Sequence, residues 1–236
     1  MGCATIVAVR VRRSFAFVDV SGFTALTDSA GDERAVAVLD TFRTLAREIC
    51  SRRGVRIAKW LGDGAMLVNV ASEPILAATL EMQFAAARAA APIEIASGVA
   101  VGDVILYEGD DYIGHCVNVA ARLTDRAARG EVLAAAEAVE CLPPWAVVLA
   151  TEEVTLRGLE RPIPVARLGF RPLTEAVVDD PVCGIPLNRS VAEITVRDGR
   201  GVERWFCSES CYDTWERRPA PPPDDQGSLR SPLIGS

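Results

Sequence analysis

Three short stretches of this 236-residue chain set polar side chains into apolar sequence. The first, "FAFVDVSGFTAL" (15–26), reaches Asp19 at the end of an apolar run, and the second, "KWLGDGAM" (59–66), places Asp63 between two glycines. Carboxylates at neighbouring strand ends suit Mg²⁺ or Mn²⁺, which take oxygen ligands and share their sites with phosphates. Each motif alone also suits a plainer role, with Asp63 in a hairpin turn and Ser21 as a helix N-cap.

A small-residue turn follows Asp19 and leads into a helix. Its residues Gly22, Phe23 and Thr24 would expose backbone N–H groups at the helix start. These groups and the helix dipole attract phosphate.

The third stretch, "DYIGHCVNVAARL" (111–123), places two polar side chains four residues apart on a helix. Asn118 and Arg122 therefore share one face. Asn118 would orient a ribose, and Arg122 would stabilise charge that develops on a phosphate. The alternative is that both simply face solvent. We interpret His115, the only histidine, as structural.

Lys59 is the only lysine, and the other 24 basic residues are arginine. Strand alternation predicts that Lys59 lies on the same face as Val55, Ile57 and Leu61, an unusual place for a solvated charge. The alternative is a strand-end side chain that reaches for solvent.

The order of elements predicts an α+β fold. We expect a ferredoxin-like βαββαβ core, an antiparallel sheet with two helices on one face. The expected elements are a strand at 14–23, a helix at 24–53, a hairpin at 55–70, a helix at 72–91, one or two strands at 93–109, a helix at 117–128, and short strands at 131–134, 146–150 and 163–168.

Together the three stretches resemble the catalytic domain of class III nucleotide cyclases, over residues 14–170. The resemblance implies an adenylate cyclase that converts ATP to 3′,5′-cyclic AMP and pyrophosphate. Attack of the ribose 3′-oxygen on the α-phosphate would be assisted by two Mg²⁺ or Mn²⁺ ions per active site. The implied roles are metal binding by Asp19 and Asp63, adenine selection by Lys59 and Asp111, and transition-state binding by Asn118 and Arg122.

The resemblance also implies a head-to-tail homodimer. Two active sites would then be shared, with the metal-binding aspartates from one subunit and the other four groups from its partner. The family has a further phosphate-binding basic residue late in the domain, for which Arg157 and Arg161 are both candidates.

The adenine assignment follows from hydrogen-bonding chemistry. Adenine offers an acceptor at N1 and a donor at its N6 amino group, whereas guanine reverses both. Lysine only donates and ionised aspartate only accepts, so the pair matches adenine. Guanine would leave both side chains unpaired, which a polar site rejects strongly.

A second, small unit is expected at residues 179–218, after a linker at 171–178 and before a disordered tail at 219–236. Its "DPVCG" and "FCSESC" segments resemble the YHS domain, a module associated with metal handling. We expect a soft-metal site at Cys183, Cys207 and Cys211. Three thiolates favour Cu(I) over Zn²⁺, which usually takes four ligands. The alternative is that the cysteines only pack.

Composition narrows the class of protein. The formal net charge of −7 argues against nucleic-acid binding. No apolar run is long enough for a membrane span, and no secretory signal is evident, so we expect a cytoplasmic protein. The competing hypotheses are a non-catalytic nucleotide-binding regulator and a metal-sensing protein.

Overall fold

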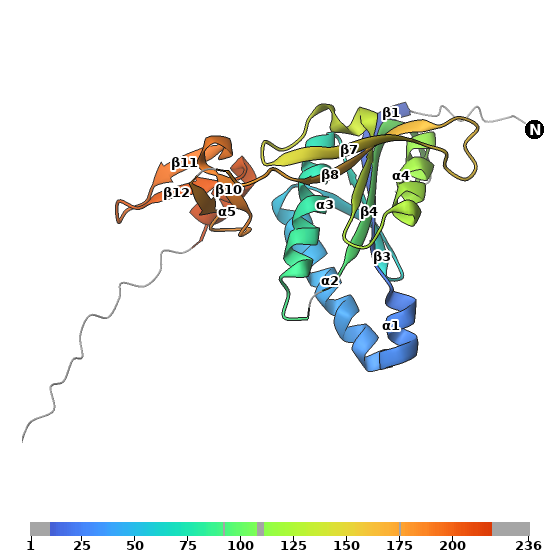
Figure 1. The fold of residues 1–236 in the computed structure, drawn as a ribbon, viewed down its shortest axis with the longest axis horizontal. Coiled ribbons are helices and arrows are strands. Elements are labelled where there is room, and N and C mark those ends of the chain that lie inside the picture. The colour runs from blue at the N-terminus through green and yellow to red at the C-terminus, as the bar shows by residue number, and fades with distance from the viewer. Residues whose placement is uncertain (1–9, 92, 108–110, 175, 219–236) are drawn as a thin grey trace, which may run out of the picture.

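The computed structural model describes residues 10–91, 93–107, 111–174 and 176–218. One eight-stranded sheet forms its centre, in the order β2-β3-β1-β4-β6-β8-β7 with β5 paired to β4 (Figure 1). The strands are β1 (Arg10–Val20), β2 (Arg56–Leu61), β3 (Gly64–Asn69), β4 (Ile95–Tyr107), β5 (Asp111–Ile113), β6 (Val132–Ala135), β7 (Ala146–Val154) and β8 (Ile163–Phe170).

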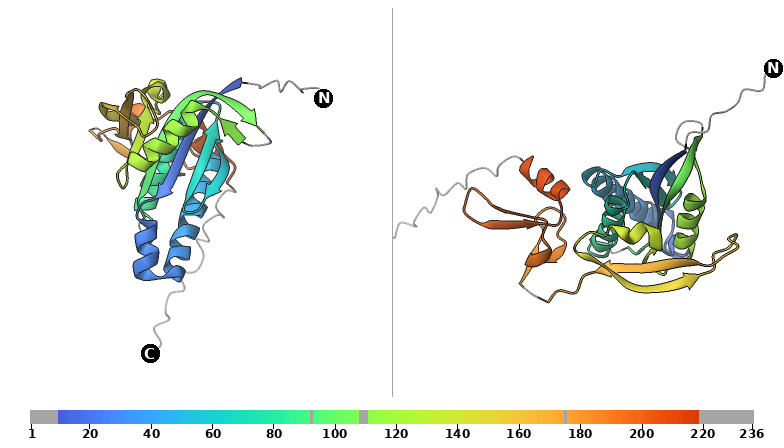
Figure 2. Two further views of the ribbon diagram at one scale, coloured as in Figure 1. Left: turned by 90° about the vertical axis from the view of Figure 1, so that its right-hand side faces the viewer. Right: turned by 90° about the horizontal axis from the view of Figure 1, so that it is seen from above.

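Helices cover both faces of this sheet. Helices α2 (Asp32–Arg52) and α3 (Ser72–Ala87) pack on one face, as the ferredoxin-like prediction requires, and α4 (His115–Arg126) packs on the other (Figures 1 and 2). A short 3₁₀ helix, η1 (Ala136–Glu140), precedes β7. Phe42 and Ile49 of α2 are buried in the first core, whereas Val119 and Leu123 of α4 lie in a second. The α+β prediction is confirmed.

The helix predicted at 24–53 is in fact two helices. Helix α1 (Phe23–Ala30) ends at Gly31, whose φ of 83° lies in the region that favours glycine, and α2 begins at the next residue. The two helices contact each other as a helical hairpin that extends beyond the sheet (Figure 1). The turn after Asp19 therefore leads into a short separate helix.

A β-bulge in β2 corrects the predicted orientation of Lys59. Ile57 pairs with Leu67, but Lys59 pairs with the next partner, Met66, so Ala58 is an extra residue. Leu67 belongs to the core under α2 and α3, and Met66 to the core under α4. Lys59 therefore lies on the α4 face, opposite Ile57, because the bulge shifts the alternation by one residue.

The C-terminal unit packs beside α2 and α3 (Figure 2). Its elements are β9 (Val177–Asp179), β10 (Pro186–Asn188), η2 (Arg189–Val191), β11 (Ile194–Arg197), β12 (Glu203–Phe206) and α5 (Glu209–Glu216). Strand β9 begins inside the predicted linker, and the predicted tail lies outside the described residues. Among the helices described, none is long and apolar enough to cross a membrane.

Candidate functional site

Asp19 and Asp63 meet at one end of the sheet. Asp19 pairs with Gly64 across β1 and β3, and the backbone N–H of Val20 donates to the carbonyl of Asp63 across 3.2 Å. A Cβ at Gly64 would lie 2.9 Å from Oδ1 of Asp19, so only glycine leaves room for this carboxylate. The strand register thus brings the two predicted metal ligands together.

The surroundings of Asp19 disfavour its charge. Burial, then the charges of Asp63 and Asp125, raise its pKa to about 6. The carboxylate borders a cavity of about 200 Å³ between the sheet and α4, lined also by Leu61, Gly64 and Thr124. Among the residues that the structure describes, no basic side chain forms an ion pair with Asp19, and such crowded carboxylates fit a divalent cation that prefers oxygen ligands.

Asp125 is a third carboxylate at this cavity, and the sequence reasoning did not single it out. Its Oδ2 accepts a hydrogen bond from Arg122 across 3.0 Å. The sequence could have indicated this contact, because Asp125 follows Arg122 by three residues on the same helix and side chains at that spacing are neighbours. The predicted transition-state arginine is therefore held by a neighbour whose charge also reaches Asp19.

Lys59 and Asp111 form an ion pair, with Nζ of Lys59 donating to Oδ1 of Asp111. The two residues come from β2 and β5, which are 52 positions apart in sequence. Both side chains stay about half exposed, so their outer edges remain open to a ligand. Beside them Arg56 donates to the hydroxyl of Tyr112, which links the same two strands.

Asn118 and Arg122 lie one turn apart on the exposed side of α4. His115, the first residue of that helix, is also exposed. Within the parts of the chain that the structure describes, no hydrogen bond or ion pair joins Asn118 or Arg122 to the aspartates at 19 and 63. The structure therefore brings Asp19 close to Asp63 and Lys59 close to Asp111 within one chain, whereas Asn118 and Arg122 face outward.

The turn before α1 carries a cation that the sequence reasoning missed. Gly22 is the N-cap of α1 with φ of 75°, and a Cβ there would lie 2.5 Å from a guanidinium nitrogen of Arg129. Arg129 and Gly22 border a cavity of about 340 Å³, and Glu94 pairs with Arg129 across 3.5 Å. Exposed helix N–H groups beside an arginine suit phosphate.

The two late arginines lie elsewhere. Arg157 and Arg161 are exposed in the connection between β7 and β8, far from α1 in Figure 1. Of the three arginines, Arg129 is the one that borders the turn before α1 of its own chain.

The three predicted cysteine ligands do come together, and a carboxylate joins them. One potential ligand atom from each of four residues lies within 4.8 Å of the others, a group that we call the cysteine cluster: Asp180, Cys183, Cys207 and Cys211. Hydrogen bonds from Cys183 and Cys207, with the charge of Arg53 nearby, lower the pKa of the Cys211 thiol. The sequence reasoning missed Asp180 as a candidate ligand.

Residues 12–163 match the family described as the adenylate and guanylate cyclase catalytic domain. An uncharacterized protein of Mycobacterium tuberculosis is 34% identical over 156 residues, which are 66% of this chain and 41% of that protein. An adenylate cyclase of Streptomyces coelicolor is 32% identical over 123 residues, which are 52% of this chain and 32% of that protein. The chain thus spans less than half the length of these curated relatives.

Solved structures share the fold. The guanylyl cyclase Cya2 has a TM-score of 0.61 at 19% identity, covering 70% of this chain and 95% of that one. The adenylyl cyclase CyaB from P. aeruginosa has a TM-score of 0.59 at 23% identity, covering 71% and 98%. The family match covers well over half of the sequence and includes all three predicted motifs, so this chain belongs to the adenylate and guanylate cyclase catalytic-domain family.

Proposed function

We propose that the protein is an adenylate cyclase, which converts ATP to 3′,5′-cyclic AMP and pyrophosphate. The observation that carries this choice over guanylate cyclase is the ion pair between Lys59 and Asp111. The pair offers one pure donor and one pure acceptor at adjacent positions, with exposed outer edges.

Adenine fits this pair in one orientation. Its N1 accepts from Lys59 and its N6 amino group donates to Asp111. Guanine carries a donor at N1 and an acceptor at O6, so each contact would become a clash of like groups. The β-bulge supports the proposal, because it turns Lys59 to the α4 face of the sheet, where its Nζ reaches Asp111.

The carboxylates at 19 and 63 are proposed to hold two Mg²⁺ or Mn²⁺ ions, since their oxygens suit hard cations. Bound metal would lower the pKa of the ribose 3′-hydroxyl and stabilise charge on the phosphates. The raised pKa of Asp19 supports this role, because a nearby cation would relieve the repulsion between the carboxylates.

The remaining groups position the nucleotide. The N–H groups of Gly22, Phe23 and Thr24, with Arg129, would hold the terminal phosphates. Asn118 would orient the ribose so that its 3′-oxygen bonds to the α-phosphorus while the bond to the β-phosphate oxygen breaks. Arg122 would meet the negative charge that gathers on the α-phosphoryl group, and the hydroxyl proton would pass to solvent.

A homodimer would complete the site. Asn118 and Arg122 are exposed, and the cavity beside Asp19 measures about 200 Å³, which is small beside the roughly 300–1,000 Å³ of a typical ligand site. A second copy packed head to tail would place its Asn118 and Arg122 across from the aspartates of the first.

The deciding experiment measures turnover of ATP and GTP, with Mg²⁺ and with Mn²⁺. We expect cyclic AMP as the main product. The double variant Lys59→Glu, Asp111→Cys should lose ATP turnover by about 10²-fold or more relative to GTP, because its polar groups no longer pair with adenine.

A matched control exchanges another exposed ion pair. Arg197→Glu with Glu203→Cys, in the C-terminal unit, should leave the ATP to GTP ratio unchanged. An unchanged ratio in the Lys59 and Asp111 variant would refute the base-reading role. Nucleotide binding without any cyclic product would instead favour a non-catalytic regulator.

A further inference from the structure

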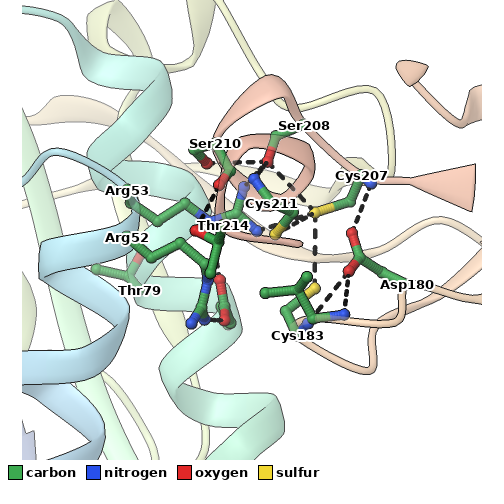
Figure 3. Close-up of polar contacts among 12 residues, drawn as sticks. Arg52, Arg53, Thr79, Asp180, Cys183, Cys207, Ser208, Ser210, Cys211 and Thr214 are labelled. Atoms are coloured by element: carbon green, nitrogen blue, oxygen red, sulfur yellow. Dashed lines mark hydrogen bonds and ion pairs between the residues drawn. The ribbon is translucent and has the colours of Figure 1, made fainter. Parts of the chain in front are cut away.

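The cysteine cluster has the geometry of a metal site. Sγ of Cys207 lies 3.6 Å from Sγ of Cys183 and 3.6 Å from Sγ of Cys211 (Figure 3). Sulfurs at the corners of a tetrahedron around a metal, with bonds of about 2.3 Å, would be about 3.8 Å apart. The thiols therefore already stand near the spacing that a shared ion requires.

The carboxylate of Asp180 accepts hydrogen bonds from the loops that carry two of these cysteines. Its Oδ1 accepts from the backbone N–H groups of Val182 and Cys183 at 2.7 and 3.1 Å, and its Oδ2 accepts from the N–H of Cys207 at 2.7 Å. A carboxylate has about four acceptor positions, so these three bonds leave one position for an ion. Asp180 can thus orient two ligands and act as a fourth.

The cluster lies directly against the cyclase core. Arg53, at the end of α2, donates from Nη2 to Sγ of Cys207 at 3.1 Å and from Nη1 to Oγ of Ser208 at 2.8 Å. Its Nε donates to Glu81 of α3 at 2.8 Å, and Arg52 donates to the same carboxylate. The side chains of Arg53 and Glu81 are only 3% and 2% exposed. One buried guanidinium therefore joins α2, α3 and a cysteine of the C-terminal unit.

We propose that the cysteine cluster binds one divalent ion of the Zn²⁺ class, and that Arg53 couples this metal site to helices α2 and α3. Asp180 supplies the fourth group whose absence favoured Cu(I) on sequence grounds. Three thiolates and a carboxylate around a divalent ion leave two formal negative charges, against three around Cu(I). Arg52 and Arg53 can balance two negative charges better than three, because Glu81 already neutralises part of their positive charge.

A cavity borders Arg53 and Ser208, two residues that contact Cys207 of the cluster. It has a volume of about 420 Å³ and lies between the cyclase core and the C-terminal unit. Three carboxylates also line it, and their charge would draw a cation inward: Glu73, Glu193 and Glu209. The four converging ligand atoms and the hydrogen bonds that orient them support a metal site at the cysteine cluster.

The first test measures metal stoichiometry. The full reduced chain, stripped with a chelator, is titrated with Zn²⁺ against a chromogenic competitor, with excess Mg²⁺ to occupy the aspartate site. We expect one tightly bound Zn²⁺ per chain, lost in Cys183→Ser and in Cys207→Ser. Cys141→Ser, at an exposed free thiol, is the matched control and should bind normally. No uptake, or uptake that survives Cys207→Ser, would overturn the site.

The ligand set has its own spectroscopic signature. Co²⁺ in place of Zn²⁺ should give sulfur-to-cobalt charge transfer and the ligand-field bands of a tetrahedral ion. Uptake of Cu(I) under anaerobic conditions, with no uptake of Zn²⁺, would refute the divalent assignment.

The second test addresses the role of Arg53. Zn²⁺ should slow amide hydrogen exchange in the C-terminal unit and also in the last turn of α2 and in α3. Arg53→Gln should weaken Zn²⁺ binding by about 10–100-fold, as loss of an outer partner does at other metal sites. At saturating Zn²⁺, the Arg53→Gln variant should show a smaller Zn²⁺-dependent slowing of exchange at the end of α2 and in α3 than the wild type shows. Arg53→Lys keeps the buried charge, so it tests the same point if the glutamine variant does not fold. Protection confined to the C-terminal unit in the wild type would refute the coupling.

Discussion

Arg122 donates to Asp125 across 3.0 Å, at the edge of the cavity that Asp19 borders. The same carboxylate thus holds the proposed transition-state arginine and raises the pKa of the proposed metal ligand. In a head-to-tail dimer these two effects would act on different active sites, since Asp19 and Arg122 would serve different ones. Asp125 is therefore a natural place to perturb both halves of the site with one substitution.

Asp125→Asn should move the acid limb of the activity profile to lower pH. Removing this charge lowers the pKa of Asp19, so metal competes with the proton at lower pH. The shift should be on the order of a few tenths of a pH unit, because exposed charge pairs interact weakly. The measurement is turnover against pH at subsaturating Mn²⁺. Asp213→Asn, which removes a similar helical ion pair with Arg217, is the control. An unmoved acid limb would exclude Asp125 as a determinant of Asp19.

Asp19→Asn should stabilise the metal-free fold at neutral pH while abolishing turnover. The folded state raises the pKa of Asp19 from 3.8 to about 6. The contribution of Asp19 to the free energy of unfolding is therefore fully present below about pH 4, where the carboxyl is protonated. It is lost as the pH rises to about 6 and the folded protein must carry the charge. The gain from Asn should appear between these values and stay constant above pH 7. Urea unfolding with a chelator from pH 4 to 8 measures this gain.

Two comparisons sharpen the Asp19 result. Asp40→Asn, on the exposed side of α2, should not reproduce the pH-dependent gain. Added Mn²⁺ should stabilise the wild type but not Asp19→Asn, because only the former keeps both carboxylates. A variant that is less stable at every pH would contradict the charge argument.

Gly64→Ala should damage the metal site through a close contact. Its Cβ would lie 2.7 Å from the carbonyl oxygen of Val18 and 2.9 Å from Oδ1 of Asp19. We expect weaker Mn²⁺ binding and a loss of about 1–3 kcal/mol in stability, as for other overpacked sites. Gly199→Ala is the control, because a Cβ there meets nothing within 4 Å. Calorimetric Mn²⁺ titration and urea unfolding measure the two effects. Normal Mn²⁺ affinity in Gly64→Ala would show that Asp19 is not confined as described.

Mixing inactive variants tests the shared sites. Asp19→Ala and Arg122→Ala should each be inactive, but their heterodimer would hold one intact site. An equal mixture with random exchange should recover about one quarter of wild-type activity, since half the dimers would carry one working site of two. Asp19→Ala mixed with Asp63→Ala should stay inactive, because both lesions fall in the same half of each site. Dead mixtures in both cases, with exchange demonstrated, would mean that each chain forms its own site.

The sequence predicted the parts of the site that depend on local pattern. Alternation and turn residues predicted the strand that ends near Asp19 and the hairpin at Asp63. Helical spacing predicted the helix that carries Asn118 and Arg122. The orientation of Lys59 was wrong because a β-bulge has no clear local signature. The break at Gly31 was missed because the apolar periodicity continues on both sides of it.

Other features depend on pairings that sequence does not display. Arg53 and Glu81 are 28 residues apart, and Arg53 and Cys207 are 154 apart. In the sequence, Arg53 and Glu81 look like ordinary surface residues of two separate helices. Likewise Arg129 was overlooked because its neighbour, Gly22, lies far earlier in the chain, before α1, and Arg129 follows α4. Tertiary packing alone reveals these contacts.

The C-terminal unit also bears on how the chain folds. Some forty residues bury too little apolar surface to be stable alone. Here Ile185, Leu187 and Phe206 are fully buried in the same cluster as Leu76 and Leu80 of α3. The C-terminal unit therefore shares one hydrophobic core with the cyclase domain. The two should unfold in a single cooperative transition rather than one after the other. Such a module could not be transplanted to another cyclase without the surface of α2 and α3 on which its folding depends.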